Sequence, residues 1–435
     1  MKQIFTSKYF WYFGVFPATT GLIFLLRSLG LLESLELAGL DRFIRQKGLL
    51  PPSGRVALVK YTQADIDRYG NSIPDRELLQ SLIKIQKQKP TAIGLELIRD
   101  NPPSAQLNTF LAQNLVIGVE QARPLPHTAV KPIPILKQAG RTNGADLTLD
   151  PDRKIRRAYL FAHPLDGSIE ASKPSFAGML ARLYLIKNTG NDWAIDVDRS
   201  TGKVTVIANN VAVDRFAGNN AGYVNHPYSG FSFFLNQYNI TAIPQISVSD
   251  LLDDRVPNHF FKDKIVLLGS TNLIGAHLHY VPPNRRLFSL EIHANTIESF
   301  LGATLDKKPT IKTLSQSREV FITGAWLALF AVFVEILRRK TISLRLLIGS
   351  ISIVTILLSV ILYNVNFWVF NSTALWLPLI PPLLGIPIAA VSYIAAISLL
   401  DRQRYAEQIS SSIRESIDIN TSKDQKTLAK QKRLS

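Results

Sequence analysis

The chain has 435 residues, 46% of them hydrophobic, and its length allows for about two to four domains. The formal net charge is +16, but acidic residues interrupt the basic ones and no motif of a nucleic-acid-binding module is present, so we expect no nucleic-acid partner. The chain has no cysteine, which excludes disulfide bonds, thiolate catalysis and cysteine-based zinc sites.

The first apolar segment is Tyr9–Leu26, eighteen residues without a charge. A helix of this length measures about 27 Å, close to the ~30 Å hydrocarbon core of a bilayer. A cleaved signal peptide is the alternative, with Lys2 and Lys8 in its basic start. The aromatic beginning of the segment and the lack of an A-x-A-like cleavage site favour an uncleaved membrane anchor within residues 1–32.

Residues 33–318 alternate between strand and helix patterns. Arg55–Tyr61 contains an apolar run typical of a strand buried on both faces, Pro74–Lys89 places its apolar residues on one helical stripe, and Thr91–Leu97 is the next strand. This order predicts two parallel strands joined by a right-handed crossover. The further predicted elements are a helix at Gln106–Asn114, a strand at Leu115–Val119, a helix at Ser175–Lys187, a hairpin at Ala194–Ile207 and a buried strand at Ile265–Leu268. We therefore expect an α/β domain with a parallel or mixed sheet.

Three further apolar segments lie near the C-terminus, with predicted bounds Val320–Leu337, Leu346–Tyr363 and Ala374–Leu400. The last one contains several prolines, which we expect to kink its first half. They are Pro378, Pro381, Pro382 and Pro387.

Charges in the short loops predict the orientation. Arg338, Arg339, Lys340 and Arg345 lie between the first two of these segments, whereas Asn364–Asn371 carries no charge. The positive-inside rule then places the basic loop and both termini in the cytoplasm. We expect a multi-pass inner or plasma membrane protein surrounded by lipid, with four transmembrane helices, residues 33–318 outside, three helices within 319–400 and a short basic cytoplasmic tail at 401–435.

Polar residues lie at the carboxyl ends of the first two predicted strands. Open α/β sheets bind their ligands at this carboxyl-end edge, so these residues predict a polar ligand-binding pocket. In chain order they are Lys60, Thr62, Asp65, Glu96, Arg99 and Asp100.

A second candidate site lies in the sequence DLTLDPDRKIRR, where Asp150 and Asp152 precede Arg156 and Arg157. The carboxylates are suited to a cation, and the guanidinium groups to an anionic ligand. The alternative is a solvated β-turn at Asp150-Pro151-Asp152 with the arginines on the strand that follows.

Catalytic and metal motifs are weak. His277 and His279 alternate on an extended segment, and His293 and Glu291 are the candidates to complete a metal site with them, but no HExxH helix accompanies them. The sequence also has no GxSxG elbow and no nucleotide-binding glycine pattern. We therefore expect no metal ion, no cofactor and no enzymatic activity.

Several segments of the chain follow one another in a characteristic order. They are VALVKYTQADIDRYG, IPDRELLQSL, KPTAIGLELIRDNP, ADLTLDPDRKIRRAYL, and then VSDLLDDRV with FKDKIVLLGSTN, VPP and EIHAN. From Asp41 to about Leu301 the chain thereby resembles the CHASE domain of type 2, an extracellular sensory domain associated with cyclases and histidine kinases. An N-terminal anchor and a block of three membrane helices after the domain also match the layout of that family.

The resemblance implies a membrane sensor whose outside domain responds to a small molecule or a physical stimulus. In this family the output is commonly a cytoplasmic cyclase, histidine kinase or serine/threonine kinase. Residues 401–435 are too short for such a domain, so we expect a separate kinase or cyclase as the output partner. A like subunit in a homodimer is a further expected partner.

Two functions from different classes remain open. In the first, a signal shifts the last helix of the domain, Leu290–Leu305, and thereby moves the span that begins at Val320. In the second, the chain is a membrane scaffold that has kept the fold without sensing. The scaffold is favoured by Thr62 and His277, which stand where the family carries acidic residues. An anchored hydrolase is a third class, and the sequence shows no catalytic set for it.

Overall fold

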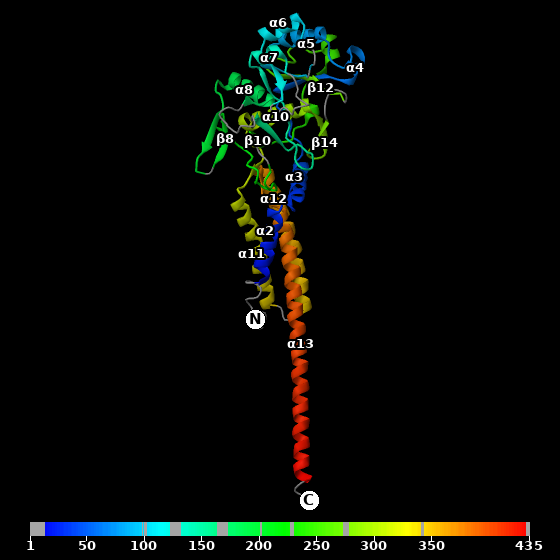
Figure 1. Ribbon diagram of the computed structural model, residues 1–435, viewed down its shortest axis with the longest axis vertical. Helices are drawn as coiled ribbons and strands as arrows, with labels where there is room; N and C mark the ends of the chain where they lie inside the picture. The colour runs from blue at the N-terminus through cyan, green and yellow to red at the C-terminus, as the bar shows by residue number, and fades with distance from the viewer. Residues whose placement is uncertain are drawn as a thin grey trace. The chain divides into compact units, whose positions relative to one another are not determined.

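The computed structural model describes residues 14–431 except 98, 100–101, 122–131, 163–172, 201, 227–229, 273–277 and 341–342. The chain divides into two compact units (Figure 1). The α/β unit comprises Glu33–Gln316 together with Asn366–Leu377. The helical unit comprises the chain up to Leu32, Ser317–Val365 and the chain from Pro378 onward.

A six-stranded sheet forms the centre of the α/β unit, and every pair of neighbouring strands in it is parallel. The order is β11 (Gln245–Ser247), β1 (Val56–Tyr61), β12 (Ile265–Ser270), β2 (Ala92–Glu96), β3 (Val116–Glu120) and β4 (Thr142–Gly144). The central strands are apolar along their length because both faces of the sheet are covered. The expected α/β architecture with a parallel sheet is confirmed, and β12 lies between the first two predicted strands.

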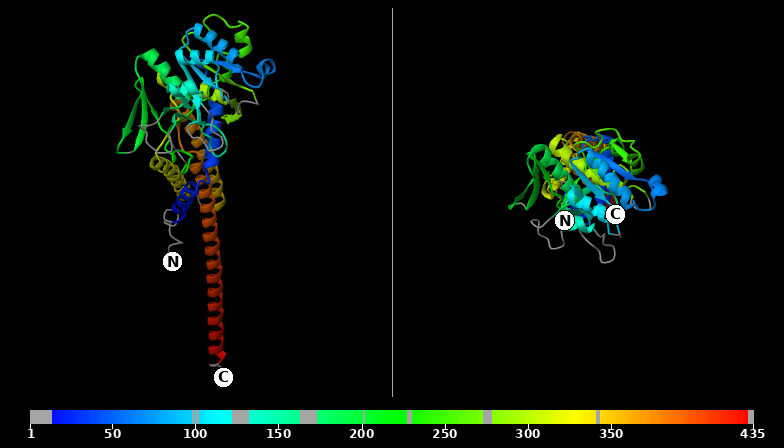
Figure 2. Two further views of the ribbon diagram at one scale, coloured as in Figure 1. Left: turned by 45° about the horizontal axis from the view of Figure 1, so that its top comes forward. Right: turned by 90° about the horizontal axis from the view of Figure 1, so that it is seen from above.

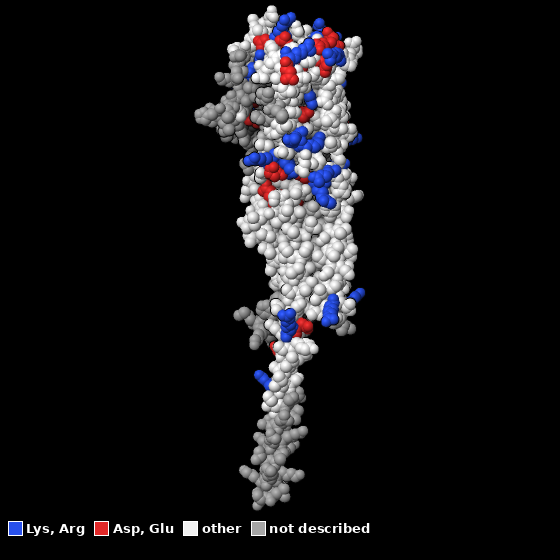
Figure 3. Space-filling view, turned by 90° about the vertical axis from the view of Figure 1, so that its right-hand side faces the viewer, with Lys and Arg blue, Asp and Glu red and all other residues white. Residues whose placement is uncertain are grey.

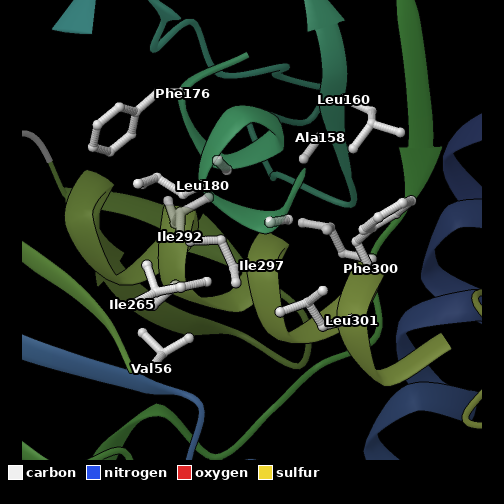
Figure 4. Packing of buried hydrophobic residues seen from close by; sticks show 14 of the residues in the cluster. Val56, Ala158, Leu160, Phe176, Leu180, Ile265, Ile292, Ile297, Phe300 and Leu301 are labelled. Carbon is white, nitrogen blue, oxygen red and sulfur yellow. The ribbon is translucent and has the colours of Figure 1, made fainter. Parts of the chain in front are cut away.

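Helices cover both faces of this sheet (Figure 2). One face carries α4 (Gln63–Tyr69), α5 (Asp75–Lys87), α6 (Ala105–Gln113), α7 (Pro134–Gln138) and α9 (Val248–Leu252). The other carries α8 (Phe176–Thr189) and α10 (Ser289–Leu305). Figure 4 shows this second layer, in which Leu180 of α8 and Ile292 of α10 lie near Val56 and Ile265 of the sheet. Helix α10 buries 14 of its 17 residues and is therefore a core element of the unit.

Smaller sheets complete the α/β unit. They consist of β5 (Arg157–Ala162) between β10 (Phe231–Phe234) and β6 (Lys173–Pro174), of β7 (Ala194–Asp198), β8 (Lys203–Ala208) and β9 (Val211–Asp214), and of the hairpin β13 (Leu278–Val281) and β14 (Arg285–Phe288). The 3-10 helix η2 (Ile240–Ala242) precedes β11. The predicted hairpin at Ala194–Ile207 is present as β7 and β8. The β13–β14 hairpin leads directly into α10, so its position fixes where that helix begins.

Helix α3 (Glu33–Lys47) opens the α/β unit, and two short strands join parts of the unit that are distant in sequence. Strand β15 (Lys312–Thr313) follows α10 and pairs in parallel with β16 (Leu375–Trp376).

The helical unit contains α2 (Phe16–Ser28) and most of α11 (Gln316–Lys340), α12 (Leu344–Thr373) and α13 (Ile380–Gln431). Helices α11, α12 and α13 are long and apolar enough to cross a membrane. On the face shown in Figure 3, the described surface of these helices carries a broad zone without Lys, Arg, Asp or Glu. The predicted first span is described only from residue 14 and has a helix of 13 residues there, so its crossing of the membrane stays a prediction.

The start of the last membrane helix differs from the prediction. The sequence placed the span at Ala374–Leu400, but the helix begins at Ile380, and β16 occupies part of the predicted first turn. Pro378 precedes the helix and Pro381 and Pro382 fall in its first turn, where the missing backbone N–H groups cost nothing. Pro387 alone remains inside the described helix, so the expected cluster of kinking prolines is instead a helix start.

Candidate functional site

The carboxyl-end edge of the sheet brings two predicted site residues into one row. Lys60 of β1 pairs in register with Gly269 of β12, and Gly269 pairs with Glu96 of β2. Residues paired in this way point to the same face of a sheet, here the face covered by α10. A Cβ atom on Gly269 would lie 2.9 Å from the Leu290 side chain and 3.1 Å from the Cβ atom of Glu96, so glycine lets α10 approach this row.

The first turns of α10 supply the groups that face the row. Lys60 Nζ donates to Glu291 Oε1 at 2.7 Å, and the other oxygen of Glu291 accepts from the Phe288 backbone N–H at 2.9 Å. His293 follows Glu291 by two residues, and its Nε2 atom lies 3.7 Å from Glu96 Oε1. We call Glu96 and His293 the Glu96–His293 pair.

The Glu96–His293 pair is enclosed by the protein. The side chains are 13% and 4% exposed, and the Phe176 ring packs edge-on against the imidazole with 5.2 Å between ring centroids. Within the described part of the chain, Glu96 Oε2 and His293 Nε2 have no hydrogen-bond partner. An unsatisfied buried polar group is costly, so these two atoms form a locally unstable point in an otherwise apolar core.

Burial determines the charge state of the pair. It raises the pKa of Glu96 to about 8, against the opposing effect of a hydrogen bond from Ser289. Burial, with a smaller contribution from His279, lowers the pKa of His293 to about 4. Both side chains are therefore neutral at pH 7, and the carboxyl group gains its charge just above that pH.

The other predicted edge residues have structural partners. Thr62 caps α4, and its backbone N–H donates to Asp65 Oδ2 at 2.7 Å. The other oxygen of the fully buried Asp65 accepts from the Ser249 backbone N–H at 2.7 Å, which ties α4 to α9. Arg99 pairs with Asp75 at the start of α5. Asp100 lies outside the described residues, as does His277.

The second candidate site forms an ion-pair network inside the protein. Arg156 has five N–H donors, and each of the five donates to a carboxylate. Its partners are Asp41 of α3, Asp150 and Asp152, at 2.6 to 2.9 Å. Lys154 Nζ also donates to Asp41, at 2.6 Å. The Arg156 network therefore ties α3 to the start of β5.

Asp150 extends this network into a cluster of aromatic rings. Its carboxylate accepts from Arg157 Nη2 at 2.7 Å and from the Tyr223 hydroxyl at 2.7 Å. The Arg157 guanidinium also stacks on the rings of Phe216 and Tyr223, with its Cζ atom 4.1 and 4.8 Å from their centroids. The expected turn is present, since Arg153 N–H donates to the Asp150 carbonyl at 2.8 Å. Asp150, Arg156 and Arg157 are buried and paired rather than solvated.

Sequence reasoning did not identify Asp41, Tyr223 or Ser289. Asp41 had a recognisable signal, because it lies beside Leu37, Leu40 and Ile44 on the buried face of α3. A carboxylate on such a face needs a cationic partner. The metal alternative has no support among the described residues, which contain no group of three or more potential metal ligands.

We expect replacement of Arg156 to lower stability strongly. Arg156→Ala leaves the buried Asp41 with Lys154 alone and removes one of the two cationic partners of the buried Asp150, which we estimate to cost about 3 to 5 kcal/mol of unfolding free energy. Chemical denaturation of the full-length protein in detergent measures this change in the unfolding free energy. Arg255→Ala is the matched control, because Arg255 is 66% exposed in its ion pairs and its loss costs about 1 kcal/mol or less. Equal effects of the two variants would contradict a structural role of the network.

We also expect a pH dependence of stability from the Glu96–His293 pair. The folded protein keeps Glu96 protonated up to about pH 8, whereas the ordinary pKa is 4.5, so the unfolding free energy falls as the pH rises between these values. His293 acts in the opposite direction, but only between about pH 4 and 6.5. From pH 6.5 to 8 the contribution of Glu96 is therefore a loss of about 2 kcal/mol.

Denaturation at pH 6.5 and 8.5 measures this loss. Glu96→Gln should remove it, because the amide does not ionise. Glu120→Gln is the control, since Glu120 ends the neighbouring strand β3 but pairs with Thr142 and Lys173. A fall of the same size in Glu96→Gln and the unsubstituted protein would refute the assignment to Glu96.

Comparison with known proteins identifies the family. A CHASE2 domain is matched over residues 18–332, which is more than half of the chain. The chain therefore belongs to the CHASE2 family of sensory domains, and the resemblance noted in the sequence is confirmed. No curated protein and no solved structure matches the chain.

Proposed function

We propose that this CHASE2 protein is a membrane sensor that relays an extracytoplasmic signal through its transmembrane helices to a separate output protein. In this proposal the chain has no catalytic activity of its own. A sensory family and three helices able to cross a membrane support it. A separate kinase or cyclase is the proposed output partner, and a second copy of the chain is the proposed partner in a dimer.

The single observation that carries the proposal is the position of α10. Its first turns hold Glu291 and His293 against the sheet edge, and the chain passes from its end at Leu305 through β15 to α11, which begins at Gln316. A change at the sheet edge that shifts α10 therefore acts on the start of a membrane helix after a short connection. A core helix enclosed on most of its surface moves as a unit rather than bending.

The Glu96–His293 pair is the proposed responsive site. Ionisation of Glu96 places a buried charge where Ser289 is its one side-chain hydrogen-bond donor among the described residues, and the cost of this burial favours a state in which α10 leaves the edge or the carboxylate reaches water. A proton, or a small molecule that supplies the missing hydrogen bonds, would bind the two states with different affinity. Such differential binding is the requirement for a signal of either kind.

We also propose the membrane topology read from the charges. The α/β unit lies outside, four helices cross the membrane and both termini are cytoplasmic. Arg338, Arg339 and Lys340 at the end of α11 support the cytoplasmic position of the α11–α12 loop.

A membrane scaffold remains the second proposed function, and one observation favours it. Asp65, Arg156 and Arg157, which the sequence suggested for ligand binding, are paired with other parts of the chain. A scaffold with these residues would have a rigid α/β unit and no response at Glu96.

The relay can be tested because the chain has no cysteine. Spin labels on Lys340→Cys and Ser410→Cys report the distance between the end of α11 and an interior position of α13 by pulsed electron paramagnetic resonance in lipid nanodiscs. We expect the distance distribution to differ between pH 6.5 and 8.5, and Glu96→Gln to abolish the difference while Glu120→Gln retains it. Identical distributions at both pH values would reject this relay and favour the scaffold.

The topology predicts the activity of fused reporters. A reporter that is active only in the cytoplasm should be active when fused after Ser435 and inactive when inserted after Gly140, in the α/β unit. Equal activity at both positions would overturn the proposed orientation.

A further inference from the structure

The last turns of α12 and the residues that follow them are part of the α/β unit, and we call Asn366–Leu377 the connection. Residues Asn366–Leu377 belong to that unit, although the matched family region ends at residue 332. In this connection β16 pairs with β15 in parallel, with Thr313 opposite Trp376. The Lys312 backbone N–H donates to the Ala374 carbonyl at 2.8 Å. The α/β unit thus receives a strand from the segment between two membrane helices.

Trp376 anchors the connection in the core. It is 1% exposed, and its indole packs edge-on against Phe234 and Tyr223, with 6.0 and 6.3 Å between ring centroids. A Cβ atom on Gly222 would lie 3.4 Å from the indole and 2.6 Å from the Glu36 side chain. The glycine therefore allows both Trp376 and α3 to approach the same backbone.

Tyr223 joins this anchor to the Arg156 network. Its ring contacts Trp376, while its hydroxyl donates to Asp150, which accepts from Arg156, the partner of Asp41 on α3. A second contact runs directly from α3 to α12, where the rings of Phe43 and Phe370 lie 5.6 Å apart. The connection is therefore held to α3 at two places.

We propose that the Asn366–Leu377 connection is a coupling element through which the α/β unit controls α12 and α13, in addition to the route from α10 to α11. This inference rests on the proposed sensor function for its biological meaning. Helix α13 begins four residues after Trp376 and continues for 52 residues, so a displacement of the anchor acts directly on the helix that ends in the C-terminal tail. Trp376, Tyr223 and the Arg156 network then change state together.

Hydrogen exchange of the full-length protein in nanodiscs tests this cooperation. Trp376→Ala should raise the exchange of the Lys312 amide and of α3 by at least about tenfold, because the network opens as one unit. Trp368→Ala is the matched control, since Trp368 lies on the same connection but is 69% exposed. The control should leave both rates unchanged.

A milder variant tests the coupling from the other side, since coupling between two sites is reciprocal. Tyr223→Phe keeps the ring beside Trp376 and removes the hydrogen bond to Asp150. It should raise amide hydrogen exchange at Leu375 and Trp376 as well as in α3. Leu251→Ala is the control, because Leu251 lies in the core on the opposite face of the sheet. This control should not raise exchange at Leu375, Trp376 and α3 more than elsewhere in the protein.

The exchange measured in the two variants decides whether the connection and α3 are coupled. Effects that spread between the connection and α3 in both directions support the coupling element, and effects that stay local to each substitution overturn it. The measurement uses neither a signal nor an output protein. Failure of the Glu96-dependent relay would therefore leave this result standing, and a negative result here would leave the route from α10 to α11 intact.

Discussion

The buried guanidinium of Arg156 is the constraint on which the packing of α3 in the α/β unit depends. Removing a cation from water is expensive unless every donor is paired, and this one is paired only when carboxylates from α3 and from the turn before β5 converge on it. The seating of α3, the turn at Asp150 and the hydroxyl of Tyr223 are therefore fixed together. Few alternative arrangements of these segments would satisfy the same charges, so the network gives this part of the α/β unit one defined geometry.

The two polar clusters of the α/β unit differ in how completely they are satisfied. In the Arg156 network all donors of the central residue are used, so its members hold one another in place and open together rather than one at a time. In the Glu96–His293 pair two buried atoms have no partner within the described chain, and the carboxyl group ionises close to neutral pH. A fully paired network and a site with unsatisfied groups suit the sensor that we propose, because a change of charge at Glu96 would then move α10 as a whole element.

Much of the fold could be predicted because strands buried on both faces and membrane helices have strong apolar patterns. The strands β1, β2 and β12 were recognised from such runs, as were the three long helices. The position of β12 between β1 and β2 was not predicted, because an apolar run carries no information about its neighbours. The start of α13 was misplaced for a related reason, since Leu375 and Trp376 are equally apolar in a domain core and in a membrane. At the site, Glu96 and Lys60 were found from their place at strand ends, whereas Asp41 and Tyr223 depend on contacts between distant segments.

The strand pair β15–β16 determines which parts of the chain the folded α/β unit requires. Its residues come from before α11 and from after α12, so the folded unit is not contained in one continuous stretch of sequence. A graft that transferred residues 33–316 to a different membrane anchor would leave Tyr223 and Phe234 without the indole that covers them. A transplant that keeps the α/β unit complete therefore has to include α11, α12 and the chain up to Leu377, rather than end after α10.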